Sequence, residues 1–145
     1  MYRFLLVALT SVILYSCEIR NNKKHTDVIA REASANFNDT TSVQIIDSLF
    51  NFGQIMDGEK VEYNFRFKNT GTKPLIISAA RASCGCTVPE KPEAPIPPGQ
   101  IGFLKVVFDS KGRIGNAHKD IRVSSNATPA FPILMLVGEV IAKSK

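Results

Sequence analysis

Residues 61–68 read VEYNFRFK, and this stretch decides the fold. Its apolar residues Val61, Tyr63, Phe65 and Phe67 alternate with polar or charged ones. Successive side chains of a β-strand point to opposite faces, whereas a helix would scatter these four apolar side chains around its axis. The stretch therefore predicts a strand of an antiparallel sheet that has one face on a core and the other in water.

Similar segments lie on both sides of this strand, separated by turn-forming residues such as NTGT at 69–72 and MDGE at 56–59. Glycine, proline, asparagine and aspartate at such points are typical of turns between strands. The segments predicted as strands are 43–46, 49–55, 60–68, 75–80, 101–109, 118–126 and 131–141. Seven to eight strands at regular spacing predict an all-β, immunoglobulin-like antiparallel β-sandwich.

Composition narrows the class of protein. The chain of 145 residues has 44% hydrophobic and 21% charged residues, which fits one folded domain and argues against disorder. The net charge of +5 comes from lysines and arginines that are scattered among acidic residues. Because nucleic-acid-binding proteins gather such charges on one face, we expect no nucleic-acid partner.

The N-terminus predicts an export signal. A charge at Arg3 precedes an almost continuously apolar run, which ends at LYSC, residues 14–17. This arrangement is typical of a secretory signal peptide and is too short to span a membrane comfortably. LYSC resembles a bacterial lipobox, which implies cleavage after residue 16 and a lipid-carrying Cys17 at the new N-terminus. The alternative is an ordinary signal peptide that leaves Cys17 as a free thiol.

The predicted organisation follows from this signal: a lipoprotein signal peptide at 1–16, a flexible lipid-anchored tether at 17–41, and the sandwich domain at 42–145. The tether is polar and mixed in charge. No acidic cluster of the kind that resembles a surface-export signal follows Cys17. We therefore expect an outer- or inner-membrane lipoprotein of the cell envelope that faces the periplasm, with the lipid at Cys17 as its membrane contact.

An ordered series of short motifs resembles the bacterial DUF1573 family, which is related to the ASPM/SPD-2/Hydin immunoglobulin-like domains. The motifs are FGQI (52–55), GEKV (58–61), FRFKNTG (65–71), PL (74–75), SCGCTVP (83–89), IPPG (96–99), SN (125–126) and GEV (138–140). The resemblance covers about residues 49–141. It implies an immunoglobulin-like sandwich on a secreted or anchored envelope protein, and it implies no particular reaction.

Cys84 and Cys86 form the one candidate site with distinctive chemistry, and three interpretations stay open. The two residues could be small structural side chains. They could form a disulfide across Gly85, although an extended backbone would place the Cα atoms about 6.5–7 Å apart, the upper limit for bridging. They could also hold Cu(I), which favours sulfur ligands. A zinc site would need two further ligands, and His118 is the only histidine in the domain.

The proline-rich segment 89–100 is a candidate interaction loop, because proline lowers the entropy cost of ordering a binding surface. Its proposed contact residues are Pro89, Pro92, Pro95, Pro97, Pro98 and Gly99. The alternative is that the loop only connects two sheets. The leading functional hypothesis is a non-enzymatic envelope lipoprotein that binds a protein or a cell-wall component. The second hypothesis is a copper- or redox-handling protein that uses Cys84 and Cys86.

An enzyme is the class that the sequence supports least. General acid–base catalysis needs a placed histidine or a pair of carboxylates, and no serine-nucleophile or phosphate-binding glycine motif is present. We therefore expect neither a catalytic residue nor a cofactor, apart from the Cu(I) alternative.

The lipid anchor gives the first prediction. Replacing Cys17 by serine removes the sulfur that would carry the lipid, so Cys17→Ser should move the protein from the membrane fraction to the soluble fraction of the cells. Fractionation followed by immunoblotting measures this shift, and an unchanged membrane fraction would refute the anchor.

Overall fold

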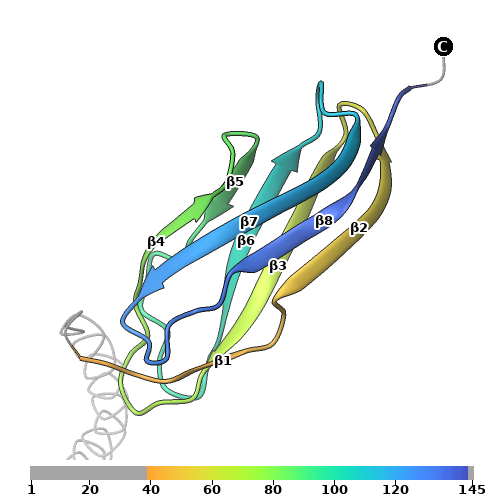
Figure 1. Cartoon of the computed structure of the whole chain (residues 1–145). Coiled ribbons are helices and arrows are strands. Elements are labelled where there is room, and N and C mark those ends of the chain that lie inside the picture. The colour runs from red at the N-terminus through yellow and green to blue at the C-terminus, as the bar shows by residue number, and fades with distance from the viewer. Residues whose placement is uncertain (1–38, 144–145) are drawn as a thin grey trace, which may run out of the picture. The chain divides into compact units, whose positions relative to one another are not determined.

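The computed structural model describes residues 39–143, which form two packed four-stranded β-sheets (Figure 1). The first sheet has the spatial order β1-β3-β6-β5, with β1 Val43–Ile45, β3 Lys60–Asn69, β6 Ile101–Asp109 and β5 Thr87–Glu90. The second sheet has the order β2-β8-β7-β4, with β2 Leu49–Met56, β8 Leu134–Ile141, β7 Gly115–Ser125 and β4 Ile77–Ala82. The predicted immunoglobulin-like sandwich is confirmed, with eight strands.

The alternation that predicted β3 sets its place in the core. Phe65 and Phe67 are almost fully buried, while Arg66 between them is exposed. β3 pairs with β6 from Lys60↔Asp109 to Lys68↔Ile101, so the two apolar rows point to the same side. Burying one such aromatic side chain contributes roughly 1.5–3 kcal/mol. The second sheet covers this surface with its own buried row: Ile77, Ala117, Ile121, Leu134, Leu136 and Val140.

One strand pair departs from the antiparallel expectation. β2 pairs with β8 in parallel, and the register shifts between Asn51 and Gln54. The chain passes from β1 into the second sheet at residues 46–48, and the N–H of Met135 donates to the C=O of Ser48 at 2.8 Å. β2 and β8 therefore start at the same end of the sandwich, which makes them parallel (Figure 1). All other strand pairs are antiparallel.

Several sequence predictions concern residues that the structure does not describe. The expected signal peptide, Cys17 and most of the expected tether lie outside residues 39–143. Thr41, at the end of the expected tether, is buried and bridges to Ala127. The packed domain thus includes Thr41. Among the described residues, no helix is long and apolar enough to cross a membrane.

A buried asparagine joins the connections at one end of the sandwich. Asn69 is fully buried at the end of β3. Its Nδ2 donates to the C=O of Lys73 at 2.8 Å and to the C=O of Ile96 at 2.9 Å. Its Oδ1 accepts from the hydroxyl of Thr41 at 2.9 Å and from the N–H of Gly71 at 3.1 Å. One side chain thereby joins three segments that are distant in sequence.

Asn126, which follows β7 of the second sheet, likewise bonds backbone groups of distant segments. Its Nδ2 donates to the C=O of Asp39 at 2.6 Å and of Pro74 at 3.0 Å, and its Oδ1 accepts from the N–H of Ile76 at 2.8 Å. Its backbone C=O accepts from the N–H of Thr41 at 3.1 Å. The segment that enters the domain is therefore bonded to both asparagines, and Figure 1 shows it crossing the end where β3 stops and β6 begins.

Gly71 allows this close approach. A Cβ atom at residue 71 would overlap the hydroxyl of Thr41 and would stand 2.5 Å from the backbone nitrogen of Ser42. Both N–H groups at Thr70 and Gly71 donate to the C=O of Ser42, at 3.0 and 3.2 Å. Glycine at position 71 is thus required by its packing against the incoming segment.

The asparagine contacts give a stability prediction. Asn69→Ala removes a hydrogen-bond partner of the buried Ile96 carbonyl, the partly buried Lys73 carbonyl and the buried Thr41 hydroxyl, and each buried group left unsatisfied costs roughly 1–3 kcal/mol. The free energy of unfolding should therefore fall by about 3 kcal/mol, measured by urea denaturation. Asn64→Ala is the matched control, because Asn64 is exposed on the same strand and its loss should change stability by less than about 0.5 kcal/mol. Equal effects of the two substitutions would contradict the role given to Asn69.

Candidate functional site

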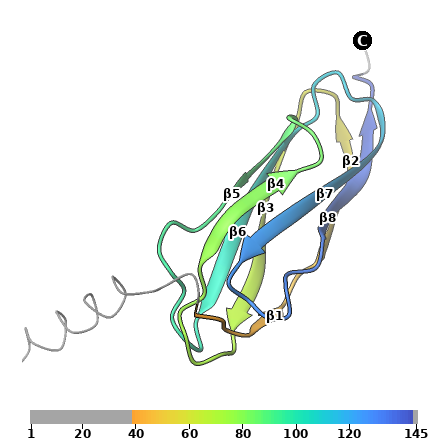
Figure 2. The ribbon, with the colours of Figure 1, turned by 60° about the vertical axis from the view of Figure 1, so that its left-hand side comes forward.

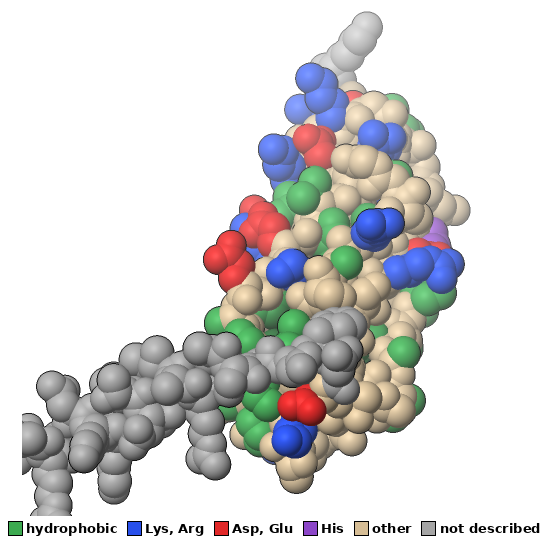
Figure 3. Space-filling view, turned by 90° about the vertical axis from the view of Figure 1, so that its left-hand side faces the viewer, with side chains coloured by type: hydrophobic (Ala, Val, Ile, Leu, Met, Phe, Trp, Pro, Cys, Tyr) green, Lys and Arg blue, Asp and Glu red, His purple; other side chains and the backbone are tan. Residues whose placement is uncertain are grey.

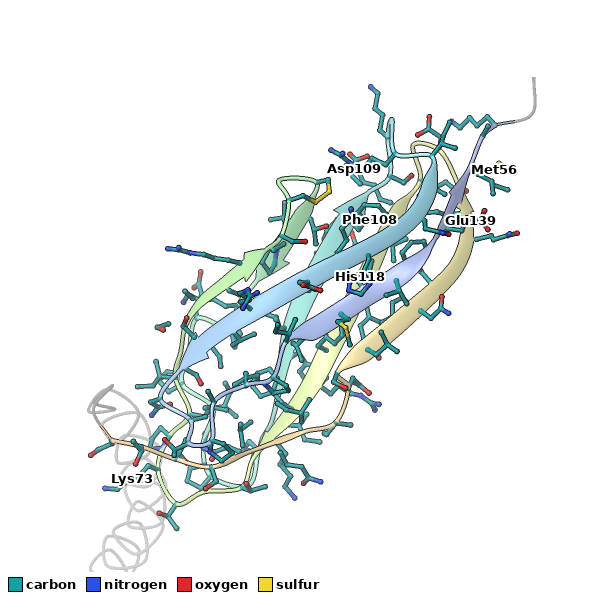
Figure 4. All side chains as sticks on the ribbon, viewed as in Figure 1. Met56, Lys73, Phe108, Asp109, His118 and Glu139 are labelled. Atoms are coloured by element: carbon teal, nitrogen blue, oxygen red, sulfur yellow. A yellow bond between two sulfur atoms is a disulfide. The ribbon has the colours of Figure 1, made fainter. Side chains whose placement is uncertain are left out.

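Cys84 and Cys86 lie in the connection through which the chain passes from β4 in the second sheet to β5 in the first. The structure joins them by a disulfide, with their Cα atoms 5.3 Å apart. This separation is shorter than an extended backbone would give, because residues 83–86 form a bend and a turn. Figure 4 shows the bridge at the tip of this connection, near Asp109. The exposed Gly85 lies between the two cysteines.

Backbone hydrogen bonds hold this turn independently of the disulfide. They run from Ser83 N–H to Asp120 C=O at 2.9 Å, from Thr87 N–H to Cys84 C=O at 3.3 Å, and from Asp109 N–H to Cys86 C=O at 2.9 Å. The disulfide itself closes a loop of only three residues, so in the chain-entropy model it stabilises the fold by only about 1.6 kcal/mol. The turn is anchored by the sheets on both sides.

The two sulfurs have different environments. Cys86 belongs to the buried core with 6% of its surface exposed, whereas Cys84 is only partly buried. The hydroxyl oxygen of Thr87 lies 3.7 Å from the Cys84 sulfur and 3.8 Å from the Cys86 sulfur. Disulfide sulfurs carry no hydrogen, so the Thr87 hydroxyl is the donor in both contacts. Cys84 is thus the more exposed of the two residues, and the buried hydroxyl of Thr87 lies beside both sulfurs.

A metal at this site would have few further ligands. Within residues 39–143 there is no group of three or more histidine, cysteine, aspartate or glutamate side chains that could hold a metal ion. His118 is exposed on β7, and its Nε2 lies 3.0 Å from the Asp120 carboxylate (Figure 4). In the disulfide form, Cys84 and Cys86 also have no thiolate to offer to Cu(I).

The structure corrects the start of the proline-rich loop. Pro89 lies in β5, opposite Val106 of β6, and not in the loop. The N–H of Asp109 donates to Cys86, and bonded pairs recur at every second residue of an antiparallel ladder. The Pro89 nitrogen therefore points away from β6, toward the free edge, where proline does not interrupt the ladder.

The rest of the loop is held tightly by the fold. Ile96 is buried and exchanges two backbone hydrogen bonds with Leu75, at 2.8 and 2.9 Å. Gly99 has a φ angle of +79°, which favours glycine, and its N–H donates to the C=O of Asn69 at 2.8 Å. Figure 2 shows the connection running beside the first half of β6. Pro92, Pro95 and Pro97 are partly buried, and Pro98 is exposed.

Exposed apolar residues on the outer face of the first sheet were not among the predicted site residues. Phe103 is 53% exposed on β6 and Ile101 is 48% exposed, while Val88 of β5 is 55% exposed. In register, Phe103 stands opposite Arg66 and Ile101 opposite Lys68. The sequence did carry a signal, because residues 101–108 are apolar in both phases of the alternation, apart from Lys105, although one face of the strand is in water.

An ion pair fixes the residue beside Phe103. The Arg66 guanidinium donates to both carboxylate oxygens of Asp47, with Nε–Oδ2 at 2.7 Å and Nη2–Oδ1 at 2.9 Å. The hydrogen bond from the Arg66 side chain lowers the pKa of Asp47 and, reciprocally, raises the pKa of Arg66. Burial is the main cause that raises the pKa of the neighbouring Tyr63. Asp47 therefore holds the Arg66 guanidinium in one orientation.

The side of the domain formed by β4 and β5 shows mixed charge. In Figure 3, lysine and arginine side chains on this face are spread among acidic and apolar ones. Lys105 lies 3.7 Å from Glu62 and 3.6 Å from Glu90, so part of the positive charge is compensated locally. No single basic stripe of the kind that tracks a nucleic acid crosses this face.

Comparisons with known proteins agree with the fold. A family model described as "Protein of unknown function (DUF1573)" matches residues 43–140, which confirms the resemblance seen in the motifs. No curated protein matches the chain. A protein of unknown function from Porphyromonas gingivalis W83 is similar in structure, with 17% identity and a TM-score of 0.56 over 75% of this chain. The match covers 50% of that protein, so this chain spans about half of its length.

A second similar structure is the ASH / PapD-like domain of human CEP192, PapD-like domain 7. It has 18% identity and a TM-score of 0.50, and the match covers 72% of this chain and 88% of that one. At these identities the likeness shows the immunoglobulin-like fold and carries no activity with it.

The hydrogen-bonded turn gives a prediction for the cysteines. In Cys84→Ser/Cys86→Ser, the turn keeps its backbone bonds, so the domain should stay folded and lose only about 2 kcal/mol of stability. Circular dichroism and urea denaturation of the double variant measure both quantities. An unfolded double variant would show that the disulfide, and not the sheets, holds this connection.

Proposed function

We propose a function for this chain, which belongs to the DUF1573 family of proteins of unknown function. It would be a cell-envelope lipoprotein whose immunoglobulin-like domain binds another protein. The lipid at Cys17 would hold the domain at a membrane on the periplasmic side. Binding would require no catalysis and no cofactor. The observation that carries the proposal is the exposed apolar surface around Phe103, and the envelope location rests on the N-terminal sequence.

Phe103 has the properties of a binding anchor. It is a large aromatic side chain, half exposed, on one of the two central strands of its sheet, where its backbone is paired with β3. Aromatic side chains on rigid elements supply most of the energy at many protein interfaces because little entropy is lost when they are covered. Ile101 adds a second apolar contact two residues away on the same face.

The surroundings of this surface are ordered in advance. Arg66 is held by Asp47, and the loop 91–100 beside β6 is bonded to Leu75 and Asn69. A surface that is already ordered loses less conformational entropy when a partner covers it, so binding costs less free energy. We therefore place the proline-rich loop at the border of the proposed site. Phe103 and Ile101 would be the residues that contact the partner.

A partner would place an apolar side chain against Phe103 within a polar rim. Lys68 stands beside Ile101 in the paired strand, and Lys105 lies two residues beyond Phe103 on β6. These charges fit the common pattern of an apolar centre surrounded by polar residues at protein interfaces. A protein surface suits this pattern better than a polysaccharide of the cell wall, which lacks large apolar groups.

Crosslinking in intact cells tests the proposal. Phe103→Ser should lower the yield of a specific crosslinked partner by at least about tenfold, because loss of a central aromatic anchor commonly costs 2 kcal/mol or more of binding free energy. Ile114→Ser is the matched control, since Ile114 is 64% exposed but lies between β6 and β7, away from this surface. Equal yields from the wild type and both variants would count against this surface as the binding site.

A further inference from the structure

We propose that the Cys84–Cys86 disulfide undergoes thiol–disulfide exchange with a protein or peptide that carries two cysteine thiols, and that Cys84 is the sulfur attacked. This activity goes beyond binding and uses a different part of the domain. It concerns residues on the connection between β4 and β5, whereas Phe103 and Ile101 lie on the outer face of the first sheet.

The bridge contributes little to holding the fold. It spans one intervening residue. Two backbone hydrogen bonds already fix the same turn to β6 and β7, and a third closes the turn itself. Disulfides that stabilise proteins strongly usually close longer loops, because they remove more freedom from the unfolded chain. Opening this bridge therefore leaves both sheets and their pairing in place, which a reversible exchange requires.

Access to the two sulfurs decides where a thiolate attacks. The attacking sulfur, the attacked sulfur and the leaving sulfur must lie nearly in line. A thiolate that attacks Cys84 approaches from the side away from Cys86, and Cys84 is partly exposed. An attack on Cys86 would have to reach a side chain that belongs to the buried core. The geometry thus assigns Cys84 as the exchanging sulfur and Cys86 as the leaving sulfur.

Thr87 supports the leaving sulfur. Its hydroxyl is buried and lies 3.8 Å from the Cys86 sulfur and 3.7 Å from the Cys84 sulfur, so it can donate to a thiolate at either position. A donor beside a thiolate favours the charged form. Thr87 does not exchange electrons itself, and its part is to stabilise and position the sulfur that leaves.

The exchange is balanced in two steps. A substrate thiolate attacks the Cys84 sulfur, the Cys84–Cys86 bond breaks, and Cys86 leaves with the electron pair as a thiolate. The second substrate thiolate then attacks the substrate sulfur of this mixed disulfide, and Cys84 leaves as a thiolate. The substrate dithiol is oxidised to a disulfide by two electrons, and Cys84 and Cys86 take up two protons as free thiols.

The test uses the full chain with Cys17→Ser, which removes the third thiol, and a synthetic peptide that carries two reduced cysteines. The oxidised protein should convert one equivalent of peptide to its disulfide and gain two alkylatable thiols, both read by mass spectrometry. A bridge that stays intact in excess peptide, with no peptide oxidised, would overturn the proposal.

Single-cysteine variants test the assignment of Cys84. With a peptide disulfide as the probe, Cys86→Ser should form a mixed disulfide at Cys84, whereas Cys84→Ser should form none in the folded state. Circular dichroism on each variant establishes that the fold is kept. Equal trapping by the two folded variants, or trapping by Cys84→Ser alone, would contradict the assignment.

Substitutions at Thr87 separate a chemical from a structural role. Thr87→Val keeps the volume but loses the donor, so peptide oxidation should slow several-fold while the melting temperature changes little. Thr87→Ser keeps the hydroxyl and should restore the rate. If Val and Ser at position 87 give the same rate, the hydroxyl has no part in the exchange.

Discussion

The fold depends on buried asparagine amides that replace missing backbone partners at one end of the sandwich. The connections at this end carry N–H and C=O groups that neither sheet can pair, and leaving them buried without partners would cost more than the contacts gain. Asn69 and Asn126 satisfy these groups, and no buried side-chain nitrogen or oxygen in residues 39–143 lacks a partner. Thr41 is bonded to both, so the entry of the chain into the domain is part of the same network.

Several of the family motifs meet one another in the fold. A Cβ at Gly138 would stand 2.6 Å from the C=O of Gly53 and would overlap Phe52, so the motif at 138–140 fits against the motif at 52–55. Residues 69–71 bind the loop at 96–99, and Asn126 binds residues 74–76. Motifs that are distant in sequence meet in pairs that hold backbone together. Most of the motif series therefore serves to hold this sandwich together, while the SCGC segment forms the disulfide-bonded turn between the two sheets.

The sequence predicted those features that depend on local alternation. Phe65 and Phe67 were placed in a core by period-two spacing, and the structure buries both. The parallel pairing of β2 with β8 could not be predicted in this way, because strand order is set by how the chain crosses between sheets. The proline-rich pattern predicts a loop that begins at Pro89, but at a free edge the nitrogen of Pro89 faces away from the ladder, so proline fits in the strand. Phe103 was not predicted as a site residue, because the sequence of β6, with apolar residues in both phases, does not say which of its two faces the second sheet covers.

The same limits apply to the candidate site. Spacing alone left three interpretations of Cys84 and Cys86, because an extended backbone and a turn place the two sulfurs differently. Partners within the sheets, Asp109 and Asp120, decide that the connection is a turn, and these residues are far from it in sequence. The difference in burial between the two sulfurs also arises from tertiary packing. The chemistry of such a cysteine pair can therefore be predicted specifically only once the fold is known.

Amide hydrogen exchange at Thr41 and Gly71 tests most directly the claim that the asparagine network closes the domain. Both amides donate within this network, Thr41 to Asn126 and Gly71 to Asn69 and Ser42. If the network holds the end of the sandwich shut, the two amides open only with the whole fold and exchange as slowly as those of β3 and β6. Exchange at the rate of an unprotected loop would show that the end opens independently and would contradict the account.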